Sequence, residues 1–248
     1  MSEDRSVLER TAKPPDQVLH YGPDPQHLVD VRFPPVAAAN RPLVMVVHGG
    51  FWRPEYDRAH TSPMGEALAA AGWTVATIEY RRIPGAPDAT VQDVRLAIDA
   101  VPGLIPRHTG KLLLIGHSAG GHLVLWAASR CSSAALQGVL ALGPVADLQL
   151  AHARGLGEHA VLAFLGTDPN RRPDLDPARL NPPRVPAILL HGELDAIVPL
   201  AISEAYHARH SSRLVRLAGA GHFAVIDPRA AAWHDVLRNL TVLAGALA

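Results

Sequence analysis

Short runs of apolar residues alternate along the chain with longer stretches in which apolar residues recur at helical spacing. An unbroken apolar run is typical of a strand buried on both faces, and helical spacing is typical of a helix with one buried face. The runs predict strands at 28–33, 43–47, 73–78, 111–115, 136–142, 185–190 and 214–217. The periodic stretches predict helices at roughly 63–71, 88–101, 119–130, 199–210 and 229–246. Strands separated by helices favour an α/β fold with a mostly parallel sheet covered on both faces, preceded by an antiparallel strand at 28–33.

The stretch 144–184 interrupts this alternation. It contains a helical pattern around 158–165 and a loop at 167–183 that is rich in Pro, Asp and Arg. Long excursions in α/β proteins commonly lie over the carboxyl ends of the strands, where ligands bind. We therefore expect a small lid inserted into a single domain that spans 1–248. A surface insertion without a role is the alternative.

A glycine-rich turn follows the strand predicted at 111–115. The turn reads Gly116-His117-Ser118-Ala119-Gly120-Gly121 and leads into a helical pattern. Gly-x-Ser-x-Gly between a strand and a helix is typical of a sharp turn that exposes a nucleophilic serine on strained backbone. Glycines flank the serine because side chains at positions 116 and 120 would clash with the neighbouring strand and helix. The motif predicts Ser118 as a nucleophile, and an idle serine in a glycine-rich turn is the alternative.

A second glycine motif follows the strand predicted at 43–47, which ends in His48-Gly49-Gly50-Phe51-Trp52. A His-Gly-Gly segment in this place brings backbone N–H groups close to a reacting carbonyl. Such donors stabilise the oxyanion of a tetrahedral intermediate and are worth ~10²–10³ in rate each. A simple strand-end turn is the alternative. We predict an oxyanion hole formed by the N–H groups of Gly50, Phe51 and Ala119. We predict that the side chains of Trp52 and Phe223 line an adjoining substrate site.

An acid and a base follow the last two predicted strands. Glu193 and Asp195 both lie beyond the strand at 185–190, and Asp195 is favoured because it lies further out, just before the next helix. His222 lies on a glycine-flanked loop beyond the strand at 214–217. A histidine takes the serine proton while a carboxylate holds its tautomer and stabilises the imidazolium. The pattern predicts acyl transfer by Ser118 with His222 as general base and Asp195 orienting it.

The composition limits the partners of the protein. Of its 248 residues, 48% are hydrophobic and 19% charged, and 23 basic residues balance 23 acidic ones. This balance gives no reason to expect nucleic acid or a membrane surface as a partner. There is one cysteine, Cys131, so an intrachain disulfide is excluded. The start of the sequence has no apolar segment typical of a secretory signal, and we expect a cytoplasmic protein.

The histidines give no pattern typical of a metal site. His207 and His210 share a predicted helix, but no third carboxylate or thiol ligand accompanies them. We expect no metal and no cofactor, and a monomer or homodimer whose partner is a small-molecule ester or amide substrate.

With these residues identified, the chain resembles the arylformamidase (kynurenine formamidase) and carboxylesterase-like branch of the α/β-hydrolases. The resemblance rests on the opening Tyr21-Gly22, the His-Gly-Gly-x-Trp motif at 48–52, Tyr80-Arg81 followed by Asp93, and the segment 116–123. It implies an α/β-hydrolase fold, a Ser118–Asp195–His222 triad and a small ester or aryl-formamide substrate. The sequence departs from the branch at Arg179-Leu180-Asn181-Pro182, where relatives often have Ser-Pro, so the chemistry is better defined than the substrate.

Two other functions compete with this interpretation. A non-catalytic ligand-binding protein on the same fold is possible in principle, although such proteins usually lose a triad residue and none is missing here. An oligopeptidase-type hydrolase needs an extra propeller domain, for which 248 residues leave no room. A substrate carboxylate could be held by Arg53, Arg81 or Arg82, but for Arg81 a structural ion pair with Asp93 is the favoured interpretation.

Overall fold

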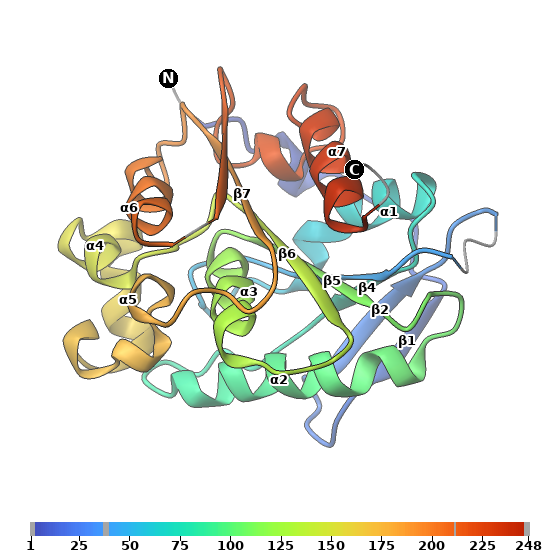
Figure 1. The fold of residues 1–248 in the computed structure, drawn as a ribbon, viewed down its shortest axis with the longest axis horizontal. Coiled ribbons are helices and arrows are strands. Elements are labelled where there is room, and N and C mark those ends of the chain that lie inside the picture. Colours follow the sequence, from blue (N-terminus) through green and yellow to red (C-terminus); the bar gives the residue numbers. More distant parts are fainter. Residues whose placement is uncertain (1–2, 37–39, 211, 246–248) are drawn as a thin grey trace.

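A computed structural model describes residues 3–36, 40–210 and 212–245. Within them, eight strands form one sheet in the order β1-β2-β4-β3-β5-β6-β7-β8 (Figure 1). The strands are β1 (Gln17–His20), β2 (Leu28–Arg32), β3 (Leu43–Val47), β4 (Val75–Ile78), β5 (Leu112–His117), β6 (Leu136–Leu142), β7 (Ala187–Gly192) and β8 (Arg213–Leu217). The pairs β1–β2 and β2–β4 are antiparallel, and all later pairs are parallel. The predicted α/β-hydrolase fold class, with its antiparallel start, is confirmed.

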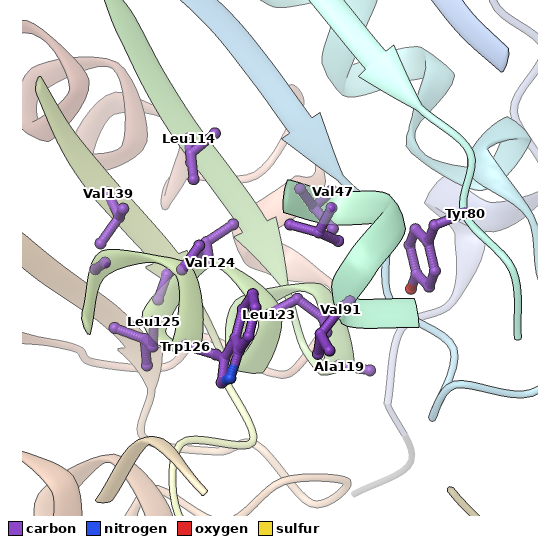
Figure 2. Close-up of a cluster of buried hydrophobic side chains, with 14 of the residues drawn as sticks. Val47, Tyr80, Val91, Leu114, Ala119, Leu123, Val124, Leu125, Trp126 and Val139 are labelled. Atoms are coloured by element: carbon purple, nitrogen blue, oxygen red, sulfur yellow. The ribbon is translucent and has the colours of Figure 1, made fainter. Parts of the chain in front are cut away.

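Helices cover both faces of this sheet. They are α1 (Ser62–Ala70), α2 (Pro87–Leu104), α3 (Ala119–Arg130), α4 (Leu148–Ala153), α5 (Leu156–Leu165), α6 (Ala201–Arg209) and α7 (Trp233–Leu243). On one face, α2 and α3 bury Val91, Leu123 and Trp126 against Val47 and Leu114 of the sheet (Figure 2). On the other face, α1 and α7 bury a second cluster that includes Met64, Leu68, Val236 and Leu240.

The central strands explain why the carboxyl edge of the sheet is a fixed platform. Every residue of β3 and β5 is buried, and β5 pairs with β3 on one side and β6 on the other. Apolar side chains on both faces of a strand can be buried only between two helical layers. The loops that leave β3, β5, β6 and β7 therefore start from one rigid edge and lie next to one another.

The expected lid contains more structure than its sequence pattern predicts. Besides α5, it holds α4 and three single turns at Pro169–Arg171, Pro173–Leu175 and Pro177–Arg179. The fully buried carboxylate of Asp176 accepts N–H bonds from Leu148, Gln149 and Ala178 and so ties the segment to itself. Val161, Phe164 and Leu165 of α5 belong to the main core cluster. The segment thus packs onto the domain through its apolar side chains.

None of the helices in the described parts of the chain combines the length and apolar character that crossing a membrane requires.

Candidate active site

Ser118 occupies the sharp turn between β5 and α3 that its motif predicts. Its backbone has φ 55° and ψ −116°, a conformation that costs energy for any residue with a side chain. The Ser118 N–H donates to the Leu142 carbonyl at 2.9 Å, which ties the turn to the end of β6. The flanking glycines are required sterically: a Cβ at Gly116 would lie 2.2 Å from the Gly120 oxygen, and one at Gly120 would lie 2.0 Å from the Val47 oxygen.

Asp195 and His222 meet although 27 positions separate them. His222 Nδ1 donates to Asp195 Oδ2 at 2.7 Å, and both side chains are almost fully buried. The alternative acid, Glu193, is exposed. Such a contact fixes the tautomer that leaves Nε2 of His222 free to accept a proton.

The Asp195 carboxylate is held in its charged form by its neighbours. Its Oδ1 accepts the N–H groups of Ile197 at 3.0 Å and Val198 at 2.7 Å. His191 Nε2, which donates to the Val198 carbonyl at 2.7 Å, also lies 3.3 Å from Oδ2. Burial opposes ionisation, but the hydrogen bonds from His191, His222 and Val198 outweigh it and hold the pKa of Asp195 well below its ordinary value. The site therefore contains a permanent negative charge behind His222.

Two contacts bring the Asp195–His222 pair to the Ser118 turn. His117 Nε2, directly before Ser118, donates to the His222 carbonyl at 3.0 Å. Gly143, the residue after Leu142, lies against both partners, since a Cβ there would be 3.3 Å from Asp195 Oδ2 and from His222 Nδ1. Within the described residues, no hydrogen bond joins Ser118 Oγ to His222. The turn and the pair thus adjoin each other in a site where Ser118 and His222 are each 2% exposed.

His117 helps to position the His222 loop, a role that the sequence does not indicate. Burial, followed by the nearby His222, lowers the pKa of His117 well below its ordinary value, so its ring is neutral at physiological pH. A neutral ring with a proton on Nε2 suits its bond to the His222 carbonyl. His122, by contrast, donates from Nε2 to the Leu175 carbonyl at 2.8 Å and holds the lid segment, as expected for a packed histidine.

The segment 48–52 forms a strained loop beside Ser118. Gly50, Phe51 and Trp52 have φ of 104°, 51° and 55° in succession. A Cβ at Gly49 would lie 3.0 Å from Ser118 Cβ, which places the loop directly against the serine side chain. Within the described residues, no protein acceptor is recorded for the N–H groups of Gly50, Phe51 or Ala119. N–H groups without a protein acceptor are compatible with the predicted oxyanion hole, and the three donors stay a prediction.

A buried polar cluster behind this loop is a second feature that the sequence reasoning missed. Glu79 Oε1 accepts from His48 Nε2 at 2.9 Å and from Arg82, while the Tyr80 hydroxyl donates to the His48 carbonyl at 2.8 Å. Burial works against the charge on Glu79, but its contacts with His48 and Arg82 outweigh it and lower the pKa to about 2. The cluster anchors His48, the first residue of the strained loop.

Aromatic side chains link the loop to the lid. The Trp52 ring, 3% exposed, stacks on Phe164 of α5 with centroids 4.5 Å apart. The Phe51 ring lies against Gly157, where a Cβ would approach it to 2.9 Å. Phe223 is half-buried, and the Arg5 guanidinium lies 5.7 Å from its ring centroid. Trp52 and Phe223 remain predictions as substrate-lining residues: other parts of the chain cover the Trp52 ring, whereas Phe223 keeps part of its surface exposed.

The three arginines considered for a substrate carboxylate already contact protein groups. Arg81 forms the expected ion pair with Asp93, its Nε donating to Oδ2 at 2.9 Å. Arg82 is buried against Glu79. Arg53 donates to the Gly157 carbonyl at 2.6 Å and lies 3.1 Å from Glu158. Their first function in this structure is therefore to hold loops together.

In the described parts of the chain, no three acidic, histidine or cysteine side chains are grouped as a metal ion would require. The two helical histidines considered for such a site both contact carbonyl oxygens: His207 Nδ1 lies 2.9 Å from that of Ser212, and His210 Nε2 lies 3.0 Å from that of Pro177.

The comparison with known families identifies the fold family. The family model described as BD-FAE matches residues 29–209, a span that includes the Ser118 turn and Asp195. The chain belongs to the BD-FAE family of α/β-hydrolases. The match ends before His222, so the family assignment rests on the strands, the turn and the lid.

Relatives of this BD-FAE member carry esterase and formamidase names. Esterase LipQ of Mycobacterium tuberculosis is 30% identical over 218 residues, covering 77% of this chain and 51% of the relative. Kynurenine formamidase of Salmo salar is 33% identical over 104 residues, covering 42% of this chain and 35% of the relative. This chain thus matches about half, or less, of the length of these curated relatives. The resemblance to the esterase and formamidase branch is confirmed.

Solved structures agree on the fold. Esterase B from Lactobacillus rhamnosis superimposes with a TM-score of 0.76 at 22% identity, covering 98% of this chain and 91% of that one. A truncated carbohydrate esterase from gut microbiota gives a TM-score of 0.76 at 18% identity, covering 94% of this chain and 100% of that one. At these identities the likeness establishes the architecture alone.

Proposed function

We propose that the protein is a serine hydrolase that cleaves short-chain esters, with aryl formamides as a second substrate class. Ser118 is the nucleophile, His222 the general base and Asp195 the orienting acid. The observation that carries the proposal is the 2.7 Å contact between His222 Nδ1 and Asp195 Oδ2 next to the strained Ser118 turn. The esterase and formamidase names of the relatives support the same reaction class.

The proposed reaction needs only groups of this chain and water. His222 Nε2 takes the proton of Ser118 Oγ as Oγ attacks the substrate carbonyl carbon. The N–H groups of Gly50, Phe51 and Ala119 receive the oxyanion. His222 then gives the proton to the departing alcohol or amine, which leaves an acyl group on Ser118. Water attacks this acyl-enzyme with His222 again as base, and the carboxylic acid is released with the serine restored.

The nucleophile is tested by covalent labelling with a fluorophosphonate. We expect one adduct per chain at Ser118, measured by intact mass and peptide mapping, and activity near background in Ser118→Ala because no acyl-enzyme can form. Ser132→Ala is the matched control, since Ser132 is exposed at the far end of α3. Undiminished labelling of the Ser118→Ala variant would show that Ser118 is not the nucleophile. A wild-type protein that is never labelled would favour the non-catalytic ligand-binding function instead.

The aromatic packing between the strained loop and the lid supports a small acyl group. The Trp52–Phe164 stack and the Phe51–Gly157 contact involve the residues of the segment 48–52 that carry two of the candidate oxyanion donors or adjoin them. We expect kcat/KM for nitrophenyl esters to fall steeply from acetate to decanoate, and N-formylkynurenine to be cleaved as well. The measurement is kcat/KM across the ester series beside that for the formamide. A preference for long chains with an inert formamide would replace this substrate class by that of a lipase-like esterase.

A further inference from the structure

The Glu3 carboxylate joins the two loops that carry the candidate acid and base. Its Oε1 accepts the Ala196 N–H at 2.8 Å, directly after Asp195. Its Oε2 accepts the N–H of His222 itself, also at 2.8 Å. One side chain near the start of the chain thus binds the backbone of both loops, in addition to the direct contact between the Asp195 and His222 side chains.

The His222 loop is shaped to admit this carboxylate. A Cβ at Gly221 would lie 2.3 Å from Glu3 Oε2, so a side chain at this position would displace the carboxylate from the place where it accepts the His222 N–H. Hydrogen bonds between a carboxylate and backbone N–H groups are charge-assisted and roughly twice as strong as those between neutral groups. The glycine that precedes the base therefore has a steric purpose beyond loop flexibility.

The segment behind Glu3 is docked independently of the two bonds. Val7, in the turn Ser6–Glu9, is 2% exposed and packs in the core cluster shared with α7. Arg10 makes a forked ion pair with Asp227, five residues after His222. Arg5 lies over the ring of Phe223. These contacts hold the segment 3–10 along the His222 loop and deliver the Glu3 side chain to it.

We propose that Glu3 is a positioning residue that sets the separation of the Asp195 and His222 loops for catalysis. The proposal rests on the triad proposed above. The Nδ1–Oδ2 bond of 2.7 Å depends on where each loop places its backbone, and Glu3 binds the backbone of both. Without the two hydrogen bonds to Glu3, each loop keeps its own conformation, but the distance between the two loops is less well fixed. Small misplacements of catalytic groups have large effects on rate, so the bridge acts on kcat.

The test compares Glu3→Ala and Glu3→Gln with Glu9→Gln. Glu9 is exposed on the same segment, so its variant makes the same charge change without touching either loop. For nitrophenyl acetate we expect Glu3→Ala to lower kcat about tenfold with KM changed less than about twofold. Glu3→Gln falls between wild type and Glu3→Ala, because its amide offers one acceptor oxygen for two N–H donors. Glu9→Gln matches wild type.

Proton NMR tests the geometry of the His222–Asp195 hydrogen bond independently of enzyme activity. The Nδ1 proton in the His222–Asp195 bond resonates far downfield, and we expect its signal to broaden in Glu3→Ala and to persist in Glu9→Gln. Wild-type kcat together with an unchanged signal in Glu3→Ala overturns the proposal. A loss of kcat that Glu9→Gln shares, or that tracks a lowered Tm in both Glu3 variants, also overturns it. If Ser118 of the wild-type protein is not labelled by a fluorophosphonate, it is the proposed function that fails.

Discussion

The two halves of the candidate site are held in place by different kinds of contact. Around Ser118 the backbone packs so closely that a Cβ at Gly116 or Gly120 would lie 2.2 or 2.0 Å from a carbonyl oxygen. Around His222 the positions depend on polar contacts with scattered side chains: Glu3 and Asp195 accept from His222, His117 donates to its carbonyl, and His191 contacts Asp195.

The difference predicts which property, stability or catalytic rate, a substitution in each half lowers first. Close packing of backbone on backbone is a property of the fold, so disturbing it lowers the free energy of unfolding before it moves the catalytic groups out of position. Hydrogen bonds between loops contribute little to stability one at a time, but they define where a ring points. Substitutions of the closely packed glycines in the Ser118 half should therefore act on folding, and those of the hydrogen-bonding side chains in the His222 half should act mainly on rate.

The largest expected effect tests the His222 half. Asp195→Asn should lower kcat by about 10⁴ because the amide stabilises neither the correct tautomer of His222 nor its imidazolium. Glu193→Gln is the matched control, since Glu193 lies on the same loop and is exposed. Steady-state kinetics with a short-chain ester measures the lost rate, and urea unfolding checks that the variant is still folded under the assay conditions. If Glu193→Gln proves the more damaging variant, the orienting acid is Glu193.

A smaller effect, on stability, tests the Ser118 half. Gly120→Ala should lower the free energy of unfolding by about 2–3 kcal/mol, because the new Cβ forces α3 away from the end of β3. Gly103→Ala serves as control: nothing lies within 4 Å of a Cβ there, and the position is inside α2. Alanine there should stabilise the helix by up to about 1 kcal/mol. Equal stability of the two variants in urea would contradict the packing account.

A further effect on stability concerns the polar cluster behind the strained loop, the part of the Ser118 half that depends on a buried charge. Burial opposes the charge on Glu79, but contacts with His48 and Arg82 lower its pKa from 4.5 to about 2. A lowered pKa means that the charged form stabilises the fold above about pH 4.5, and that this contribution disappears as the pH falls through about 2.

Glu79→Gln should therefore be less stable than wild type at neutral pH, with the gap closing between about pH 4.5 and 2. Urea unfolding at a series of pH values measures this gap. A gap that stays constant across the series would show that Glu79 contributes by shape and hydrogen bonding alone.

The fold was predictable where its elements are long or fully buried. The observed β3 and β6 match the predicted 43–47 and 136–142, and α3 matches 119–130, because apolar runs and helical spacing are strong signals over these lengths. Strand β1 (Gln17–His20) was missed because it is a short edge strand with mostly exposed residues. Helix α4 (Leu148–Ala153) was missed because six residues give too few repeats to reveal a period.

The residues of the candidate site could be proposed from sequence where they are contiguous. The Ser118 turn and the 48–52 loop appear as motifs because neighbours in sequence perform one steric task. His117 lies at a strand end, but the carbonyl that it contacts lies 105 positions away, so no local pattern indicates the contact. His191 lies only four positions before Asp195, but that spacing alone does not indicate a contact. Glu3 and Glu79 have no local signal at all, since their partners are set by tertiary packing.

The contacts of Glu3 also determine how the protein is best handled in the laboratory. Its carboxylate lies at the carboxyl edge of the sheet, so an affinity tag fused ahead of it would be tethered beside the candidate catalytic loops. The other end of the described chain follows α7, where the Leu243 carbonyl accepts from Gln137 at the opposite, amino-terminal end of β6. Tags, fluorescent fusions and surface immobilisation therefore belong after α7, because the end of that helix contacts the amino-terminal end of β6 and not the loops around His222.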